Sequence, residues 1–294
     1  RLFANTMNLP SGSLQDTTYN IILSNYDQPS RYFRTLEEEG MDSQLDLSLP
    51  FGTARTISGT FKVGGAMNLK DRTFRERLFQ YDLDQGRAPY QGDADDFFDR
   101  KTGIMDTVTT SSGRQRYNFG NLVNENTILG NNYDGQFDVY AVYAMAEVRP
   151  LPRLRVIGGA RFEATRQQAA SLDDNLATGT LDADDVLPAL SMVYEVTPTM
   201  NARVAYGRTL ARPTLREISP FCSFNFIGAP VTCGNPNLAR TKVDNFDVRW
   251  EWFVRPGEIL AVSGFYKHFR NPIERAFNPI AAASNPNVQF QNVG

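Results

Sequence analysis

Side chains that carry most enzyme chemistry are scarce in this sequence. Its 294 residues include a single histidine, His268, and only two cysteines, Cys222 and Cys233. Zinc centres and iron–sulfur clusters need several ligands of these types, and a Ser-His-Asp triad needs a histidine beside its nucleophile. We therefore expect no catalytic, metal-binding or cofactor-binding residues, and a protein that is not an enzyme.

The two cysteines are the clearest chemical signal, because only residues 223–232 separate them. In a loop that faces an oxidising compartment the simplest outcome is a disulfide, which stabilises a closed loop of this size by roughly 2–3 kcal/mol. Metal binding and redox catalysis are the alternatives. Apolar residues of the same loop are candidates for contact with a ligand or partner, and packing within the loop is the competing interpretation. The candidate ligand-loop residues are Arg212, Phe224, Phe226 and Ile227.

The charged residues exclude one class of partner and indicate no metal site. Lys and Arg number 30 against 33 Asp and Glu, a net charge of -3. This balance gives no basic footprint, so we expect no nucleic-acid partner. Two acidic clusters have closely spaced oxygen ligands but lack the glycine and distal glutamate of a calcium loop, and we interpret them as solvated surface. They are Asp93, Asp95 and Asp96, and Asp182, Asp184 and Asp185.

Apolar and polar side chains alternate with a period of two residues along much of the chain, which predicts β-strands. The clearest example is Val243–Val254, with Phe246, Val248, Trp250, Trp252 and Val254 on one face and Asn245, Asp247, Arg249 and Glu251 on the other. One such strand also fits a soluble sandwich, and it is the repetition that favours a larger sheet. The pattern recurs in Asp42–Pro50, Thr56–Asn68, Gln136–Val148, Leu154–Arg166, Val186–Val196, Asn201–Thr209 and Ile259–His268, and a further strand is expected near Val288. We expect no amphipathic helix of importance to the core.

The strand segments are mostly about 9–13 residues long, which suits the 9–11 residues that a tilted strand needs to cross a membrane. Short turns alternate with long loops, as in an up-and-down meander, and in outer-membrane barrels the short turns face the periplasm. We therefore predict an all-β, antiparallel, up-and-down transmembrane β-barrel domain over residues 1–294. Its long extracellular loops are expected at about residues 69–135, 167–185, 210–242 and 269–287.

This topology assigns sides to particular residues. Trp250 and Trp252 are expected near the periplasmic interface as an aromatic belt. The charges on the polar face are expected to point into the barrel, where most pair across strands or hydrogen-bond to whatever fills the interior and a few touch a solute. They are Arg155, Arg161, Glu163, Arg203, Asp247, Arg249, Glu251 and Lys267.

Several short motifs resemble, in order and spacing, the late-barrel pattern of the TonB-dependent outer-membrane receptors. They are Thr209-Leu210-Ala211-Arg212-Pro213, Gly234-Asn235-Pro236-Asn237-Leu238, Asn245-Phe246-Asp247-Val248-Arg249-Trp250-Glu251 and Gly264-Phe265-Tyr266-Lys267. Residues 141–145 and 157–163 resemble the preceding hairpin. The resemblance implies a barrel of about 22 strands around a plug, of which this chain supplies about 8–10. We expect the plug domain and the final strands to lie outside this chain.

The resemblance also implies a function, which is active uptake of a scarce solute such as an iron chelate, cobalamin, an oligosaccharide or another nutrient. A TonB-type periplasmic energy-coupling protein would drive it through the plug. The implied location is the outer membrane of a Gram-negative bacterium, in contact with its lipids and lipopolysaccharide. Two alternatives stay open, which are a structural or interaction component of an envelope complex and a passive porin.

Overall fold

The computed structural model describes residues 3–6, 18–21, 29–52, 57–82, 93, 95–223, 230–277 and 287–294, with side chains from residue 29 onward. Within these residues the chain is almost entirely antiparallel β-structure, so the predicted all-β class is confirmed. Contacts divide the chain into two compact units. One consists of residues 1–35 and 75–129, and the other of residues 36–74 and 130–294.

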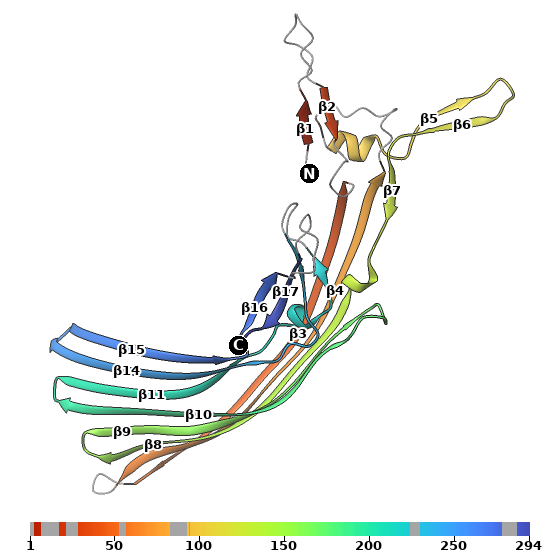
Figure 1. Ribbon diagram of the computed structural model, residues 1–294. Coiled ribbons are helices and arrows are strands. Elements are labelled where there is room, and N and C mark those ends of the chain that lie inside the picture. The colour runs from red at the N-terminus through yellow and green to blue at the C-terminus, as the bar shows by residue number, and fades with distance from the viewer. Residues whose placement is uncertain are drawn as a thin grey trace, which may run out of the picture. The chain divides into compact units, whose positions relative to one another are not determined.

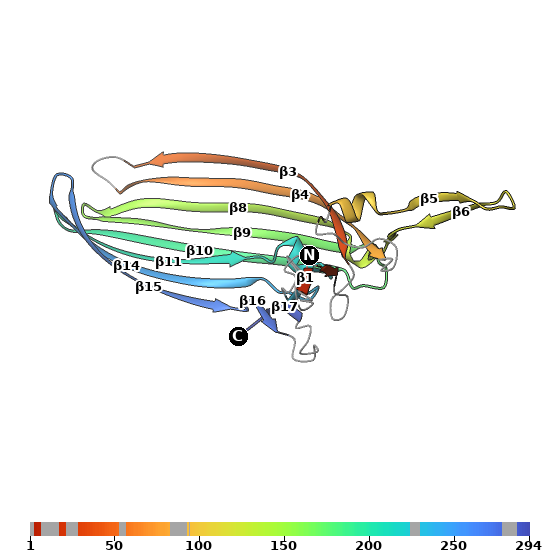
Figure 2. The same ribbon diagram turned by 90° about the horizontal axis from the view of Figure 1, so that it is seen from above.

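One large sheet contains most of the strands, and its spatial order follows the sequence (Figures 1 and 2). Each strand pairs with the next along the path, and β7 (Leu122–Glu125) pairs with β4 off this path. This is the up-and-down meander that the alternating turns and loops predicted. The path consists of β3 (Ser30–Phe51), β4 (Ser58–Asp82), β8 (Tyr133–Leu151), β9 (Leu154–Ser171), β10 (Gly179–Thr197), β11 (Met200–Ala211), β14 (Thr241–Arg255) and β15 (Glu258–Arg270).

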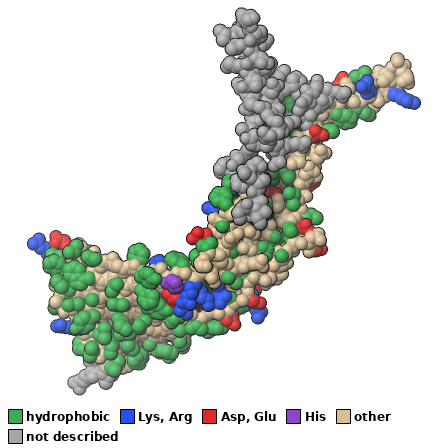
Figure 3. Space-filling model, in the orientation of Figure 1, with side chains coloured by type: hydrophobic (Ala, Val, Ile, Leu, Met, Phe, Trp, Pro, Cys, Tyr) green, Lys and Arg blue, Asp and Glu red, His purple; other side chains and the backbone are tan. Residues whose placement is uncertain are grey.

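The strand register gives the sheet two chemically different faces. Val204 of β11 lies opposite Val248 of β14, whereas Arg203 lies opposite Arg249 one residue away. Because side chains alternate between faces, these pairs belong to opposite sides of the sheet. We call the side of Val204 and Val248 the apolar face and the side of Arg203 and Arg249 the ionic face. In Figure 3 hydrophobic side chains cover a continuous area of the sheet.

The ionic face carries carboxylates that are held between basic side chains. Glu251 is nearly buried and accepts hydrogen bonds from Arg203 Nε and Arg249 Nε, each at 2.8 Å. In the β8–β9 hairpin Glu147 accepts two hydrogen bonds from Arg155, at 2.8 and 3.0 Å. Arg203 and Arg155 therefore pair across strands as predicted, whereas Arg249 contacts Glu251 within β14.

The strands extend further than the sequence pattern predicted. Much of residues 167–185, expected as a loop, is strand, since β9 ends at Ser171 and β10 begins at Gly179. Residues 69–82, also expected in a loop, continue β4. The prediction followed apolar side chains, but backbone pairing does not require them, and polar pairs such as Arg166 and Asp182 continue the ladder.

The unit of residues 1–35 and 75–129 holds shorter elements, several of which fall in the predicted loop of residues 69–135. They include the pair β1 (Phe3–Thr6) and β2 (Thr18–Ile21), the π-helical turn η1 (Asp96–Arg100) and the hairpin β5 (Ile104–Thr109) and β6 (Gln115–Phe119). Phe97 and Phe98 are buried, and the Phe98 ring packs against Tyr81 with centroids 4.7 Å apart. The Asn121 amide donates to the Phe97 carbonyl at 2.9 Å, which ties the end of the hairpin to η1.

Two glycines provide a matched test of packing in the sheet. A Cβ at Gly159 would lie 2.5 Å from Cβ of Met145 and 2.5 Å from the Ala144 carbonyl oxygen, whereas a Cβ at Gly207 would meet nothing within 4 Å. Gly159→Ala should lower the free energy of unfolding of the full-length protein by about 1–3 kcal/mol. Gly207→Ala should leave it unchanged or raise it by about 0.5 kcal/mol. Equal shifts of the urea unfolding midpoint in both variants would contradict the packing.

A second prediction concerns pH and the pairing of β7 with β4. Arg77 binds Glu125 through two hydrogen bonds of 2.9 and 3.0 Å, and with the Thr127 hydroxyl it lowers the pKa of Glu125 to about 2. Because this pKa is lowered, the ion pair stabilises the folded strands above pH 4.5, the usual carboxyl value, and the contribution disappears as the pH falls towards 2. Amide protection of β4 and β7 should fall over that range. Glu125→Gln should lack this pH dependence, and the same dependence in both proteins would refute the assignment.

Candidate functional site

The chain after β11 folds back onto the ionic face of the sheet. Pro213 begins this segment, and its carbonyl oxygen accepts a hydrogen bond of 2.7 Å from the buried Gln167 side chain of β9. The short helix α1 (Leu215–Ile218) follows, and its Leu215 side chain packs on Gly135 of β8, where a Cβ would lie only 3.0 Å away. The loop therefore rests on β8 and β9 rather than extending away from the sheet.

A hydrophobic cluster fixes the loop in place. Leu215 and Ile218 of α1 are buried in it together with residues of the sheet, which contradicts our expectation that no helix would matter to the core. A helix of four residues is too short to give a helical period in the sequence. A signal was present nonetheless, because Thr214 and Glu217 form a capping box, which Thr-x-x-Glu predicts. The buried members of the cluster are Phe74, Tyr133, Ala169, Leu215, Ile218, Phe221 and Leu238.

Arg212 ties the start of the loop to the ionic face. Its guanidinium donates to Thr165 Oγ1 at 2.8 Å and pairs with Glu163, which also accepts a hydrogen bond of 2.5 Å from Arg161. Glu163 is almost buried, so two cations compensate the charge of one carboxylate. Arg212 is thus an anchor of the loop in this structure, and its predicted contact with a ligand stays a prediction.

Cys222 and Cys233 are joined by a disulfide, with their Cα atoms 4.1 Å apart, as the sequence predicted. They close a hairpin of two very short strands, β12 (Cys222–Ser223) and β13 (Val231–Cys233). Three residues of the predicted loop site, Phe224, Phe226 and Ile227, lie outside the described residues. Nothing in the structure tests their predicted contact with a ligand.

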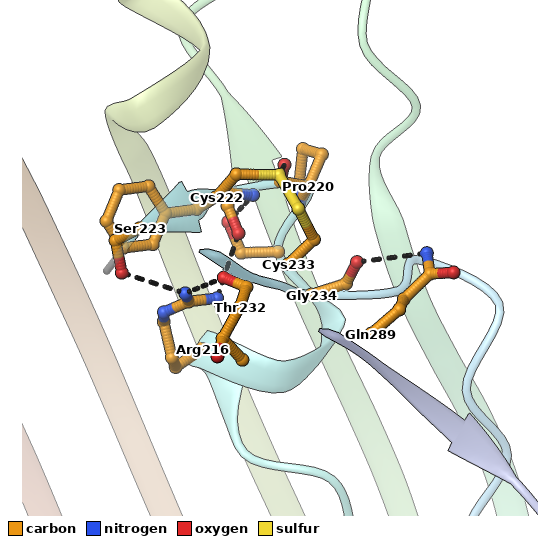
Figure 4. Close-up of a disulfide and its surroundings, with 10 residues drawn as sticks. Arg216, Pro220, Cys222, Ser223, Thr232, Cys233, Gly234 and Gln289 are labelled. Atoms are coloured by element: carbon orange, nitrogen blue, oxygen red, sulfur yellow. Dashed lines mark hydrogen bonds between the residues drawn. A yellow bond between two sulfur atoms is a disulfide. The ribbon is translucent and has the colours of Figure 1, made fainter. Parts of the chain in front are cut away.

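Arg216 of α1 holds both strands of the disulfide hairpin (Figure 4). Its guanidinium donates to the carbonyl oxygens of Phe221 and Thr232, each at 2.9 Å, and to Ser223 Oγ at 3.2 Å. It also lies over the Phe221 ring, 4.2 Å from the centroid. Arg216 therefore connects the helix, the hairpin and the hydrophobic cluster. We did not predict this role from the sequence.

The Gly234-Asn235-Pro236-Asn237-Leu238 motif returns the chain to the sheet. A Cβ at Gly234 would lie 1.9 Å from the Ser219 carbonyl oxygen, so only glycine allows this approach to the end of α1. The Asn235 backbone N–H donates to the Glu217 carbonyl at 2.6 Å, and its side chain donates to the Phe290 carbonyl at 3.0 Å. The motif thus links the loop after β11 to the chain after β15.

That second segment completes a small sheet of four strands. β16 (Ile273–Phe277) pairs with β17 (Asn287–Asn292), and β17 pairs in parallel with β13. We expected the strand near Val288 to continue the meander, but it pairs within the loop sheet instead. Parallel pairing between distant loops leaves no periodic trace in the sequence.

The remaining predicted residues occupy defined places. Trp250 and Trp252 both lie on the apolar face, with ring centroids 6.4 Å apart, and their position at the periplasmic interface stays a prediction. Asp185 is not solvated as expected. It is buried and bound by Arg240 at 2.5 Å and Lys242 at 2.8 Å. These two residues lie just before and at the start of β14, more than fifty residues away in the sequence, so the pairing could not be predicted from the neighbouring residues.

The described residues hold neither a cluster of metal-binding side chains nor a helix that could span a membrane. No three side chains among His, Cys, Asp and Glu gather there as a possible metal site. No helix in the described part of the chain is long and apolar enough to cross a membrane.

Comparison with known proteins supports the fold at low sequence identity. The chain aligns with a ferric enterobactin receptor variant from Pseudomonas aeruginosa at 13% identity and a TM-score of 0.53, covering 88% of this chain and 32% of that one. It aligns with the ferric citrate transporter FecA at 10% identity and a TM-score of 0.52, covering 87% of this chain and 30% of that one. It aligns with the siderophore receptor PiuA from Acinetobacter baumannii at 16% identity and a TM-score of 0.50, covering 79% of this chain and 32% of that one. The chain thus spans about a third of each of these structures.

Sequence similarity identifies the family. No curated protein sequence matches the chain. The family described as "TonB dependent receptor-like, beta-barrel" matches residues 3–294, which is nearly the whole sequence. Together with the antiparallel meander, this match identifies the chain as a member of the TonB-dependent receptor β-barrel family.

Proposed function

We propose that the chain forms part of the barrel wall of a receptor that imports a scarce solute across the outer membrane of a Gram-negative bacterium. In this proposal the apolar face contacts lipid, including lipopolysaccharide, and the ionic face lines the interior. Family membership supports the receptor class. The contrast between the two faces supports the orientation, because lipid-facing and interior-facing residues alternate along the strands of such barrels.

The observation that carries the proposal is the ordered loop on the ionic face. A loop that projects into a barrel from its outer end can contact a solute that enters from outside. Here the disulfide hairpin, α1 and the four-stranded loop sheet pack together, so their exposed residues are held in fixed positions. Binding costs less free energy when the contacting groups are already ordered.

The substrate and the partners follow from the proposed class. The structural relatives are named for ferric enterobactin, ferric citrate and siderophores, so we propose an iron chelate as the first cargo to test. We assign the plug and the remaining strands to parts of the protein outside this chain, and the coverage of about a third of those structures supports this. A TonB-type coupling protein acts through that plug and supplies the energy, so this chain needs no nucleotide site.

Deleting the gene tests the proposed uptake. In iron-limited medium the deletion strain should fail to grow on one ferric chelate and should recover when the intact gene is restored. Uptake should also stop when the membrane potential is dissipated, since the energy comes from the inner membrane. Normal growth on every chelate and nutrient tested, with a disrupted envelope complex, would support a scaffold instead. Solute passage that continues without a membrane potential would support a porin.

The disulfide provides a more local test. Replacing both cysteines, Cys222→Ser with Cys233→Ser, should weaken binding of the transported chelate roughly tenfold, because the hairpin loses its covalent constraint. The strands should stay folded, since their stability comes from backbone pairing in lipid.

Heat-resistant migration of the folded barrel reports the strands, and chelate titration reports the loop. Reduction of the wild-type protein should reproduce the loss of affinity, and it should not change the double serine variant further. Loss of the folded barrel in that variant would show that the loop is misplaced. Unchanged affinity would show that the hairpin does not contribute to binding.

A further inference from the structure

Two arginines lie on the apolar face, at the end of the sheet that carries the long loops. Arg208 of β11 and Arg270 of β15 both bind Asp244 of β14 between them. The register places Asp244 opposite Arg208 on one side and His268 on the other. Asp244, Phe246 and Val248 are two residues apart along β14, so their side chains lie on the same face. Asp244 and its two arginines therefore belong to the apolar face and not to the ionic one.

This placement distinguishes the group from the other shared carboxylates. Glu38, Glu163, Asp185 and Glu251 also lie between two cations each, but their register or partners place them on the ionic face. At those four carboxylates the excess positive charge faces the loops and the interior side of the sheet. At Asp244 two guanidiniums face a single carboxylate, and one positive charge remains beside the apolar area.

The exposed surface of the group belongs to the arginines. Arg270 is 49% exposed and Arg208 is 30% exposed, whereas Asp244 is 9% exposed. Lys242 is bound to Asp185 at 2.8 Å and not to Asp244. A ligand that approaches from the lipid side therefore meets guanidinium groups before it meets the carboxylate.

Aromatic rings form the boundary between these charges and the apolar area. Tyr206 and Phe246 lie with centroids 4.9 Å apart, and Phe246 and Tyr266 follow at 6.3 Å. The Tyr206 hydroxyl donates to Asp244 at 2.9 Å, which joins the aromatic row to the charged group. Figure 3 shows basic side chains and the histidine at the edge of the hydrophobic area. A shallow depression of about 420 Å³ lies here, lined by Tyr206, Arg208, Asp244, Phe246, Tyr266 and His268.

We propose that this site binds the phosphate of a phosphorylated glycolipid in the outer leaflet, as found in the lipid A part of lipopolysaccharide. Guanidinium groups bind phosphate through paired, charge-assisted hydrogen bonds. The sugar lies on the aromatic row and the acyl chains continue over Val248 and the rest of the apolar face. A free phosphate would gain only the charge interaction, which is why a lipid is the occupant that fits. The inference rests on the proposed outer-membrane location.

The test measures binding of diphosphoryl lipid A to the purified full-length receptor in detergent, by native mass spectrometry. The Arg208→Gln, Arg270→Gln double variant should bind roughly tenfold more weakly or worse, since one lost charge-assisted hydrogen bond already accounts for about that factor. Arg166→Gln is the matched control, because Arg166 is an exposed arginine of the apolar face on β9. It should bind like the wild type. An equal loss in both variants would reduce the site to a general charge effect and overturn the proposal.

The chemistry of the lipid gives the second arm. Dephosphorylated lipid A should bind wild type as weakly as diphosphoryl lipid A binds the double variant, and millimolar inorganic phosphate should not displace the lipid. Equal binding of the dephosphorylated lipid, or displacement by inorganic phosphate, would refute a lipid-borne phosphate.

Asp244→Asn gives a change of opposite sign, which a folding defect cannot imitate. It removes the competing carboxylate, so lipid A should bind about threefold more tightly or better, and weaker or unchanged binding would contradict the proposal. Heat-resistant migration and chelate uptake are followed in the same strains. If the protein folds and imports its chelate but the variants bind lipid A like the wild type, only this inference fails. Absence from the outer membrane would instead refute the proposed function.

Discussion

Every feature of this structure depends on one constraint, which is that the backbone of each strand finds its hydrogen-bond partners in the next strand. A ladder of this kind satisfies the N–H and C=O groups without water, so it can exist in hydrocarbon as well as in solution. Once the backbone is satisfied, the side chains are free to differ between the two faces. Val204 and Val248 on one side and Arg203 and Arg249 on the other are one residue apart in the same paired strands.

Charge compensation follows a repeated rule on this scaffold. Carboxylates with little exposure, such as Glu163, Asp185 and Glu251, are each bound by two basic groups from different strands or loops. A buried carboxylate without a partner would be costly, whereas one between two cations leaves a net positive charge. This arrangement has two consequences. At Glu163 it anchors the loop through Arg212, and at Asp244 it leaves positive charge at the margin of the apolar face.

The sequence predicted the parts of the fold that have a local period. The alternation in Val243–Val254 fixes which face each residue occupies, and the short turns fix the order of the strands. The two cysteines predicted their own bond because they are the only pair available. The ends of the strands were harder to predict from the sequence, because polar pairs such as Arg166 and Asp182 continue the backbone pairing without an apolar pattern.

The site was predicted only in part, because contacts between distant segments assemble it. Arg216 holds the hairpin through carbonyl oxygens of Phe221 and Thr232, and backbone acceptors cannot be recognised from residue types. The pairing of β13 with β17 joins loops that are more than fifty residues apart in the chain. Asp185 was taken as solvated for the same reason, since Arg240 and Lys242 reach it from β14 and the loop before it.

The central claim is that the apolar face of this sheet contacts lipid and the ionic face does not. Nitroxide labels placed one at a time along Val186–Val196 of β10, in the full-length protein reconstituted into bilayers, measure this directly. The account predicts that collision with oxygen, which dissolves in the hydrocarbon, alternates along the strand. It should be high at Val186, Leu190 and Met192 and low at Leu187, Ala189, Ser191 and Val193, which belong to the ionic face. Uniform accessibility along the strand, or an alternation of opposite phase, would contradict the account.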